Sequence, residues 1–150
     1  MGFRRSSHAV WECKYHIVWS TKYRKRVLRS EVICRYCSGQ LRRSASEHGI
    51  NILSLEVDID HIHLYLEVPP QRSISSAVGL LKSLSARRLF KKFPHLRKIY
   101  WGGKLWEGSY FVRAVGSGVT SEMVESYIKN HSEKAQESQQ MNLFKDSSET

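Results

Sequence analysis

The feature that most constrains this chain is the segment 60–68, in which polar and apolar side chains alternate. Successive side chains of a β-strand point to opposite faces of a sheet. One face would carry Ile62, Leu64, Leu66 and Val68. The other face would carry His61, His63, Tyr65 and Glu67. The alternation predicts a strand with one face in the core and a second face that carries groups capable of chemistry. Pro69 and Pro70 end it, because proline cannot donate to a strand ladder.

The remaining elements follow from propensity and from residues that start or stop helices. The predicted strands are 10–20, 50–58, 60–68 and 109–115, and the predicted helices are 30–48, 73–93 and 120–136. This β-α-β-β-α-β-α order is that of an α+β, ferredoxin-like βαββαβ sandwich with an added C-terminal helix. Two helices would cover one face of the sheet and leave the other free for a ligand or another subunit. We expect one domain, 1–136, and a polar, loosely ordered tail, 137–150.

Charge is unevenly distributed along the 150 residues, which carry a net charge of +10. Residues 1–50 have 11 Lys and Arg against 3 acids, whereas residues 101–150 have 5 against 7. Clustered basic residues gain affinity for nucleic acid by releasing its counterions, so a polyanionic partner is favoured over a merely solubilising surface. No run of apolar residues is long enough for a membrane span or a signal peptide, so we expect a cytoplasmic protein without a membrane partner.

Three cysteines are present, and an odd number without a secretion signal favours reduced thiols. Cys34 and Cys37 have C-x-x-C spacing, but no second pair completes a four-cysteine zinc site. Because both fall in a predicted helix, we interpret them as packing residues.

His61 and His63 are the strongest candidates for metal ligands. Their i, i+2 spacing on a strand puts two imidazoles on one side, within reach of a single cation. Two histidines do not complete a coordination sphere. Tyr127 and His131 are spaced i, i+4, so both project from one face of the last predicted helix. If that face covers the histidines, His131 becomes a third ligand with Tyr127 beside the ion; otherwise Tyr127 is an amphipathic residue packed on the sheet.

Several motifs resemble those of one enzyme family. Asp60 to Leu64, followed by Glu67 to Pro70, resembles the histidine-hydrophobe-histidine (HUH) motif of single-tyrosine transposases, the TnpA-like enzymes of the smallest insertion sequences, of the 200/605 type. Further matching segments, in the same order, are Cys13 to Trp19, Lys22 to Arg24, Leu105-Trp106, Ser109-Tyr110 and Tyr127 to Lys129. The resemblance covers about residues 8–135.

The resemblance implies that Tyr127 attacks single-stranded DNA, leaving a 5′-phosphotyrosine link and a free 3′-OH. It implies a divalent metal, Mg²⁺ or Mn²⁺, held by His61 and His63, and no nucleotide cofactor. Where the family usually has glutamine, this chain has His131, which leaves the preferred ion open. The resemblance also implies binding of DNA hairpins at element ends and a homodimer in which the tyrosine helix of one subunit can serve the histidine pair of its own subunit or of the other.

Basic and aromatic residues offer candidate DNA contacts, each of which could instead be part of a solvated surface. They are Lys22, Tyr23, Arg24, Lys25, Arg26, Arg87, Arg88, Lys91, Lys92 and Lys129. Two other functions remain open: an HUH endonuclease that processes palindromic repeats, and a non-catalytic ferredoxin-like nucleic-acid-binding module. The module would need stacking aromatics on its central strands, where this chain instead has His61 and His63.

Overall fold

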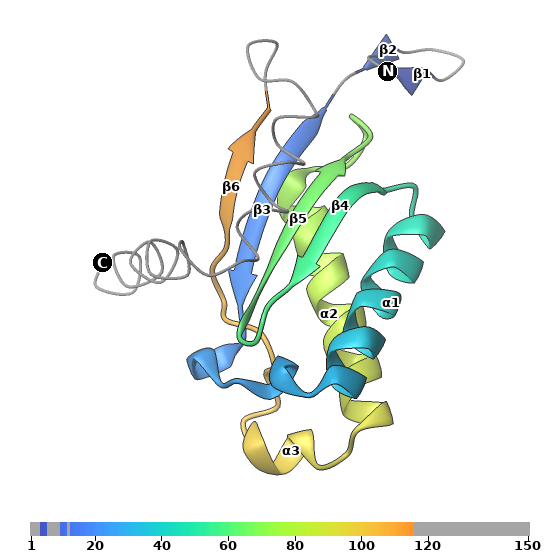
Figure 1. Cartoon of the computed structure of the whole chain (residues 1–150). Helices are drawn as coiled ribbons and strands as arrows, with labels where there is room; N and C mark the ends of the chain where they lie inside the picture. Colours follow the sequence, from blue (N-terminus) through green and yellow to red (C-terminus); the bar gives the residue numbers. More distant parts are fainter. Residues whose placement is uncertain (1–3, 6–9, 12, 116–150) are drawn as a thin grey trace.

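A four-stranded antiparallel sheet forms the centre of the protein (Figure 1). The computed structural model describes residues 4–5, 10–11 and 13–115. The strands of the sheet are β3 (Lys14–Ser20), β4 (Asn51–Val57), β5 (His61–Glu67) and β6 (Phe111–Ala114). Their spatial order is β4-β5-β3-β6, which is the order 2-3-1-4 of a βαββαβ chain. The ferredoxin-like prediction is therefore confirmed, whereas the predicted helix 120–136 and tail lie outside the described residues.

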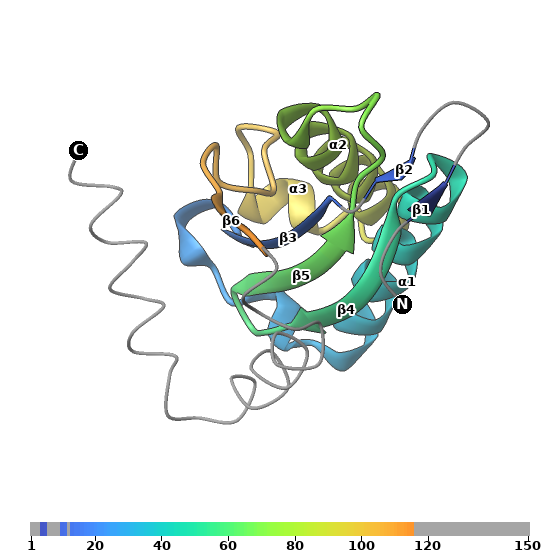
Figure 2. The same ribbon diagram turned by 90° about the horizontal axis from the view of Figure 1, so that it is seen from above.

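Two long helices, α1 (Glu31–Glu47) and α2 (Ile74–Lys92), cover one face of the sheet (Figure 2). Each begins at a serine N-cap, Ser30 or Ser73, whose hydroxyl accepts a hydrogen bond from a backbone N–H of the first turn. Helix α1 ends before Gly49, which adopts a φ of 71° that favours glycine. None of the helices in the described part of the chain is both long and apolar enough to cross a membrane.

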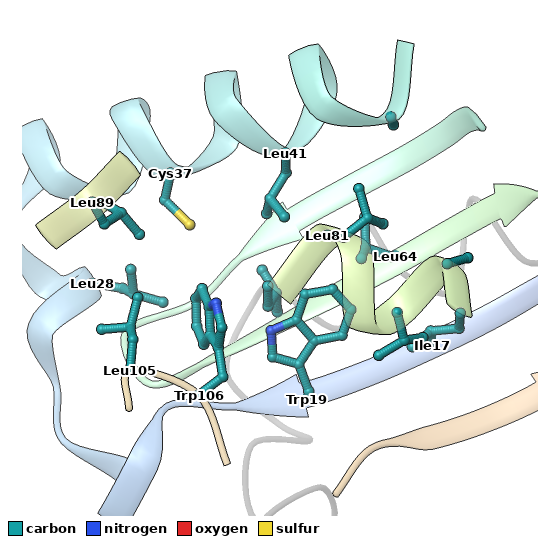
Figure 3. Packing of buried hydrophobic residues seen from close by; sticks show 14 of the residues in the cluster. Ile17, Trp19, Leu28, Cys37, Leu41, Leu64, Leu81, Leu89, Leu105 and Trp106 are labelled. Carbon is teal, nitrogen blue, oxygen red and sulfur yellow. The ribbon is translucent and has the colours of Figure 1, made fainter. Parts of the chain in front are cut away.

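The core lies between these helices and the sheet (Figure 3). Trp19 of β3 contacts Trp106 edge to face, with ring centroids 6.0 Å apart. The indole N–H of Trp106 donates a 2.9 Å hydrogen bond to the buried Ser85 hydroxyl. Aliphatic residues from both helices and the sheet complete the cluster, among them Ile17, Leu41, Leu64, Leu81 and Leu89. The inner strands β3 and β5 are thus fixed in place by a continuous apolar layer.

The predicted strand 10–20 is wrong at its beginning. Residues Val10–Trp11 form strand β2, which pairs with β1 (Arg4–Arg5) in a separate two-stranded sheet. The pairing of β3 with β5 starts only at Lys14, opposite Glu67. Because the prolines at 69 and 70 end β5 there, residues 10–11 have no partner in the main sheet.

The second face of the sheet is not free along β5, as the expected helix arrangement would leave it, because every side chain of this strand is buried. Tyr65 is fully buried and packs against Leu53 and Val115. Besides β1, three short helical elements were not predicted: the 3-10 turns η1 (Lys22–Arg24) and η2 (Val27–Arg29), and helix α3 (Leu96–Ile99). Single turns such as these leave too short a pattern to be detected in sequence.

Candidate functional site

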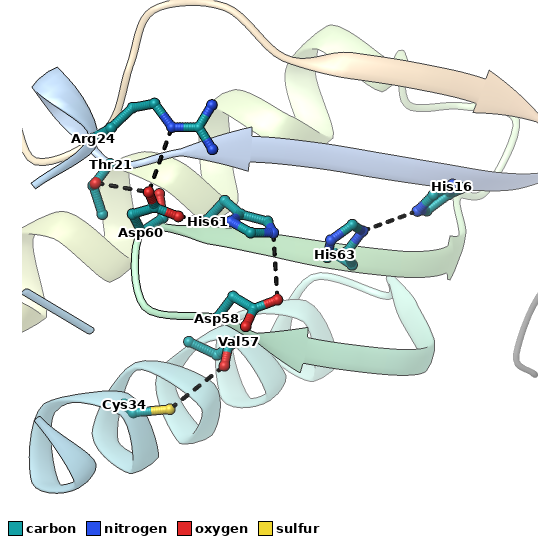
Figure 4. Close-up of polar contacts among 9 residues, drawn as sticks. All are labelled: His16, Thr21, Arg24, Cys34, Val57, Asp58, Asp60, His61 and His63. Carbon is teal, nitrogen blue, oxygen red and sulfur yellow. Dashed lines mark hydrogen bonds and ion pairs between the residues drawn. The ribbon is translucent and has the colours of Figure 1, made fainter. Parts of the chain in front are cut away.

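The two predicted histidine ligands lie side by side on β5 (Figure 4). The ring centroids of His61 and His63 are 5.0 Å apart, as expected for residues two apart on one face of a strand. Only 3% of His61 and 1% of His63 is exposed. A pair of buried imidazoles requires polar partners, because an unsatisfied ring nitrogen is costly away from water.

Asp58 joins this pair and was missed by the sequence interpretation. The residues 58–61 form the tight turn between β4 and β5, in which the Asp58 N–H donates a 2.8 Å hydrogen bond to the His61 carbonyl. Residues opposite each other across such a hairpin share a face. Asp58 Oδ2 accordingly lies 3.3 Å from His61 Nε2. The available signal was the short connection between the predicted strands 50–58 and 60–68, which requires a tight hairpin turn.

Neighbouring side chains fix the orientation of both imidazoles. Asp60 Oδ1 lies 2.7 Å from His61 Nδ1, on the opposite side of the ring from Asp58. A carboxylate at Nδ1 holds the proton there and directs the lone pair of Nε2 outward. His63 Nδ1 lies 3.4 Å from His16 Nε2, and these two rings are stacked within 14° of parallel. His16 comes from β3, so the two inner strands of the sheet both position the pair.

The Asp60 carboxyl is held in its charged form. Burial raises its pKa, but the hydrogen bond with His61 and the charge of Arg24 outweigh burial, so the net pKa is lowered. Arg24 Nε lies 3.5 Å from Asp60 Oδ2. The Asp60 carbonyl also accepts a 2.8 Å hydrogen bond from the Thr21 N–H. The turn after β3 is thereby attached to the residue that orients His61.

The cluster of Asp58, His61 and His63 fits a divalent metal ion. One potential ligand atom from each residue lies within 4.8 Å of the others. Two imidazoles and a carboxylate form a donor set used for divalent first-row metals in proteins. The predicted partners Tyr127, Lys129 and His131 lie outside the described residues, so their distance from the cluster stays a prediction.

The predicted DNA-contacting residues fall into two groups. Three of them already contact protein groups. Lys22 Nζ lies 3.4 Å from Glu107, Arg24 pairs with Asp60, and Arg88 donates to the side chains of Gln40, Ser44 and Glu47. Exposed residues form the second group: Tyr23, Lys25, Arg26, Arg87, Lys91 and Lys92. Lys129, the remaining candidate, lies outside the described residues.

The fold and site define a ferredoxin-like domain whose inner strand carries a histidine pair that, with Asp58, could hold a metal ion. The family described as "Transposase IS200 like" matches residues 9–131, which is most of the chain. The chain therefore belongs to the family of IS200-like transposases, which are DNA-processing enzymes. It is 38% identical to the ISDra2 transposase TnpA of Deinococcus radiodurans, over 83% of this chain and 88% of that protein. The transposase for insertion sequence element IS200 of Salmonella typhimurium is 35% identical, over 95% and 93%.

Solved structures agree with this assignment. A transposase structure from Deinococcus radiodurans superposes with a TM-score of 0.69 at 38% identity, covering 85% of this chain and 96% of that one. The structure of a REP-associated tyrosine transposase bound to a REP hairpin gives a TM-score of 0.54 at 11% identity, covering 85% and 68%. At that identity the second likeness shows the fold alone. Both comparisons support the α+β architecture described above.

Proposed function

We propose that this transposase is a metal-dependent enzyme that cleaves and rejoins single-stranded DNA at the ends of its insertion sequence, with Tyr127 as nucleophile. The observation that carries the proposal is the buried cluster of Asp58, His61 and His63 in a chain that belongs to the IS200-like family. Imidazoles fixed at Nδ1 and turned toward a carboxylate are suited to binding an ion rather than to packing alone. A non-catalytic nucleic-acid-binding module would not require such a cluster of potential metal ligands.

The metal would be held by His61 and His63, with Asp58 and His131 as further ligands. When bound, a divalent ion supplies charge that polarises a phosphate oxygen and offsets charge developing on it. Carboxylate oxygen suits both Mg²⁺ and Mn²⁺, whereas each additional imidazole favours Mn²⁺. Asp58 therefore makes the site more suitable for Mg²⁺ than three histidines alone would be.

The proposed chemistry proceeds by two displacements at phosphorus. The Tyr127 oxygen forms a bond to the phosphorus as the bond from phosphorus to the 3′ oxygen breaks, and that oxygen leaves as a 3′-OH. The phenol loses its proton in the same step and the leaving 3′ oxygen gains one, so the step needs no further reactant. A 3′-OH then attacks the 5′-phosphotyrosine, which releases Tyr127 and reseals DNA. The covalent link conserves the bond energy, so no nucleotide cofactor is required.

The DNA partners of this chain would be hairpins at the element ends, and the active form a homodimer with shared sites. The related fold bound to a REP hairpin supports hairpin recognition by this architecture. The net charge of +10 is appropriate for binding a DNA backbone. Residues 1–136 would act as the transposase domain and 137–150 as a tail.

Tyr127→Phe tests the nucleophile. We expect the variant to form no covalent DNA adduct with a labelled single strand from the element end, because phenylalanine lacks the attacking oxygen. Hairpin binding should remain. Tyr36→Phe is the matched control, because Tyr36 lies on α1, where its ring packs edge to face against Phe93. Denaturing gels measure the adduct, and an undiminished adduct in Tyr127→Phe would remove this residue from the mechanism.

Asp58→Asn tests the new ligand. Removing the carboxylate charge should weaken Mg²⁺-supported cleavage more than Mn²⁺-supported cleavage, because the remaining imidazoles bind Mn²⁺ better. Glu31→Gln is the matched control, since Glu31 is exposed in the first turn of α1 and pairs with Arg35. Equal metal dependence in Asp58→Asn and the unmodified protein would exclude Asp58 as a ligand.

A further inference from the structure

A small cavity lies where the turn after β3 meets the loop after α3. It has a volume of about 120 Å³, and its lining includes Tyr23, Tyr100 and Trp101, with Lys22 and Lys104 at the same surface. We propose that this cavity binds one unpaired base of single-stranded DNA, stacked against Tyr23 and Trp101, with the two lysines facing its phosphates. The inference rests on the proposed function, because it assigns a subsite for that substrate.

Two large aromatic side chains are exposed at this cavity. Tyr23 is 72% and Trp101 90% exposed, and they are the exposed large aromatics of the described residues. Large apolar groups left in water at one place indicate a binding surface. A planar aromatic face stacks on any nucleobase, and such stacking is sequence-tolerant. Their position together at one cavity is therefore what an unpaired base requires.

The backbone holds Tyr23 in an unusual conformation. Tyr23 and Arg24 have φ values of 60° and 52°, in the left-handed region that disfavours residues other than glycine. Hydrogen bonds maintain this turn: the Lys22 N–H donates to the Leu105 carbonyl at 2.7 Å, and the Arg24 N–H to the Thr21 carbonyl at 3.0 Å. Strained backbone of this kind is concentrated at binding sites, where it presents a side chain in a fixed direction. Here it presents the Tyr23 ring to solvent.

The charge around the cavity suits a phosphate. Lys22 Nζ lies 5.2 Å from the centroid of the Tyr23 ring, and Lys104 is exposed. Glu107 faces Lys22 at 3.4 Å, so Lys22 is partly neutralised, and Lys104 carries the more available charge. Burial raises the pKa of Tyr100 to about 12, so its hydroxyl stays neutral beside an anion. A single nucleotide combines the flat face and the negative charge that these groups complement.

The cavity is also connected to the histidine cluster. Thr21 N–H donates to the Asp60 carbonyl, and Arg24 contacts the Asp60 carboxylate that orients His61 (Figure 4). The turn that carries Tyr23 is thus bonded directly to the residue next to the proposed metal ligand. A DNA strand bound at the cavity would be anchored to the same turn that supports β5, which carries His61 and His63. We therefore assign the cavity to positioning the DNA strand.

Trp101→Leu and Tyr23→Asn test the subsite; asparagine tolerates the left-handed backbone at 23. Both are made in the full-length Tyr127→Phe protein, so that binding is measured without cleavage. The probes are a fluorescein-labelled 12-mer of thymidylate and a 12-mer of abasic tetrahydrofuran nucleotides. We expect each variant to lose about fivefold in affinity for the thymidylate 12-mer, the low end for one stacked base. Affinity for the abasic 12-mer should change less than twofold.

Two controls separate stacking from other effects. Val32→Ser removes an exposed apolar side chain on α1, outside the cavity, and should leave both affinities unchanged. Trp101→Phe should restore most of the affinity that Trp101→Leu loses. Binding of thymidylate within twofold of the parent protein in both variants overturns the inference, as does an equal loss for the abasic strand. Failure of the catalytic proposal is seen separately, as the absence of a covalent adduct in the protein that retains Tyr127.

Discussion

The orientation of His61 by Asp60 leads to the sharpest quantitative prediction. The contact between Asp60 Oδ1 and His61 Nδ1 is 2.7 Å long and buried, which is typical of a charge-assisted hydrogen bond. Asp60→Asn keeps the size of the side chain but removes its charge. The amide can also turn its NH₂ toward Nδ1, which favours the tautomer with its proton on Nε2. That tautomer cannot bind an ion through the nitrogen that faces Asp58.

The expected loss of metal affinity follows from the effect of removing such orienting carboxylates in other metal-binding proteins. Removing a carboxylate that orients a histidine ligand typically weakens metal binding about 10- to 100-fold, or about 1.4 to 2.7 kcal/mol. The Arg24 contact with Asp60, at 3.5 Å, is longer and more exposed to solvent, so it contributes less. Arg24→Gln should therefore weaken metal binding by less than Asp60→Asn does. The structure thus predicts that Asp60→Asn loses more metal affinity than Arg24→Gln.

The assay is a Mn²⁺ titration followed by electron paramagnetic resonance, with the ¹⁵N shifts of the imidazoles reporting the tautomer of His61. Glu47→Gln is the matched control, since this acid lies at the end of α1 and pairs with Arg43 and Arg88. Parent affinity for Mn²⁺ in Asp60→Asn, together with an unchanged tautomer, would refute the reasoning. A larger loss in Arg24→Gln than in Asp60→Asn would refute it as well.

Three further predictions concern stability. Ser30→Ala should lower the free energy of unfolding by about 1 kcal/mol in urea denaturation, because it removes the cap that accepts from the Ile33 N–H; no loss relative to the exposed Ser46→Ala would contradict this. Leu41→Ala should cost about 2 to 5 kcal/mol by the same measurement, since Leu41 is fully buried, and a loss below 1 kcal/mol would contradict its place in the core. Burial lowers the pKa of Lys82 to about 8, so between pH 8 and 10 the unfolded chain binds a proton that the folded chain has lost, and the free energy of unfolding should rise with pH. Lys82→Met should abolish this rise, and its persistence in that variant would exclude Lys82 as the cause.

Much of the fold could be predicted because its sequence signals are local. Ser30, Gly49 and Pro94 mark helix ends by their own backbone chemistry, and these limits agree with α1 and α2 to within about a residue. The strand order also follows, since a βαββαβ sequence leaves few ways to cover one sheet face with two helices. Pro69 and Pro70 predict the end of β5, but the sequence does not indicate that they also limit where β3 begins to pair with it.

The parts that sequence did not predict depend on contacts between distant segments. Nothing near Tyr65 indicates that the second face of β5 is buried, because that depends on Leu53 and Val115. His16 falls within the predicted strand 10–20, but its stacking on His63 depends on the register in which β3 pairs with β5. Asp58 is different: its place opposite His61 follows from the length of the hairpin loop, so it could have been predicted.

The bonds from the turn after β3 to Asp60 have a thermodynamic consequence. Thr21 and Arg24 hold that turn against the residue that orients His61, so the proposed DNA subsite at the turn and the proposed ion site at the histidines depend on the same contacts. If DNA tightens the hold on the ion by some factor, the ion must tighten the hold on DNA by the same factor, because the coupling free energy belongs to the pair. Affinities measured for either ligand alone would then understate those of the assembled complex.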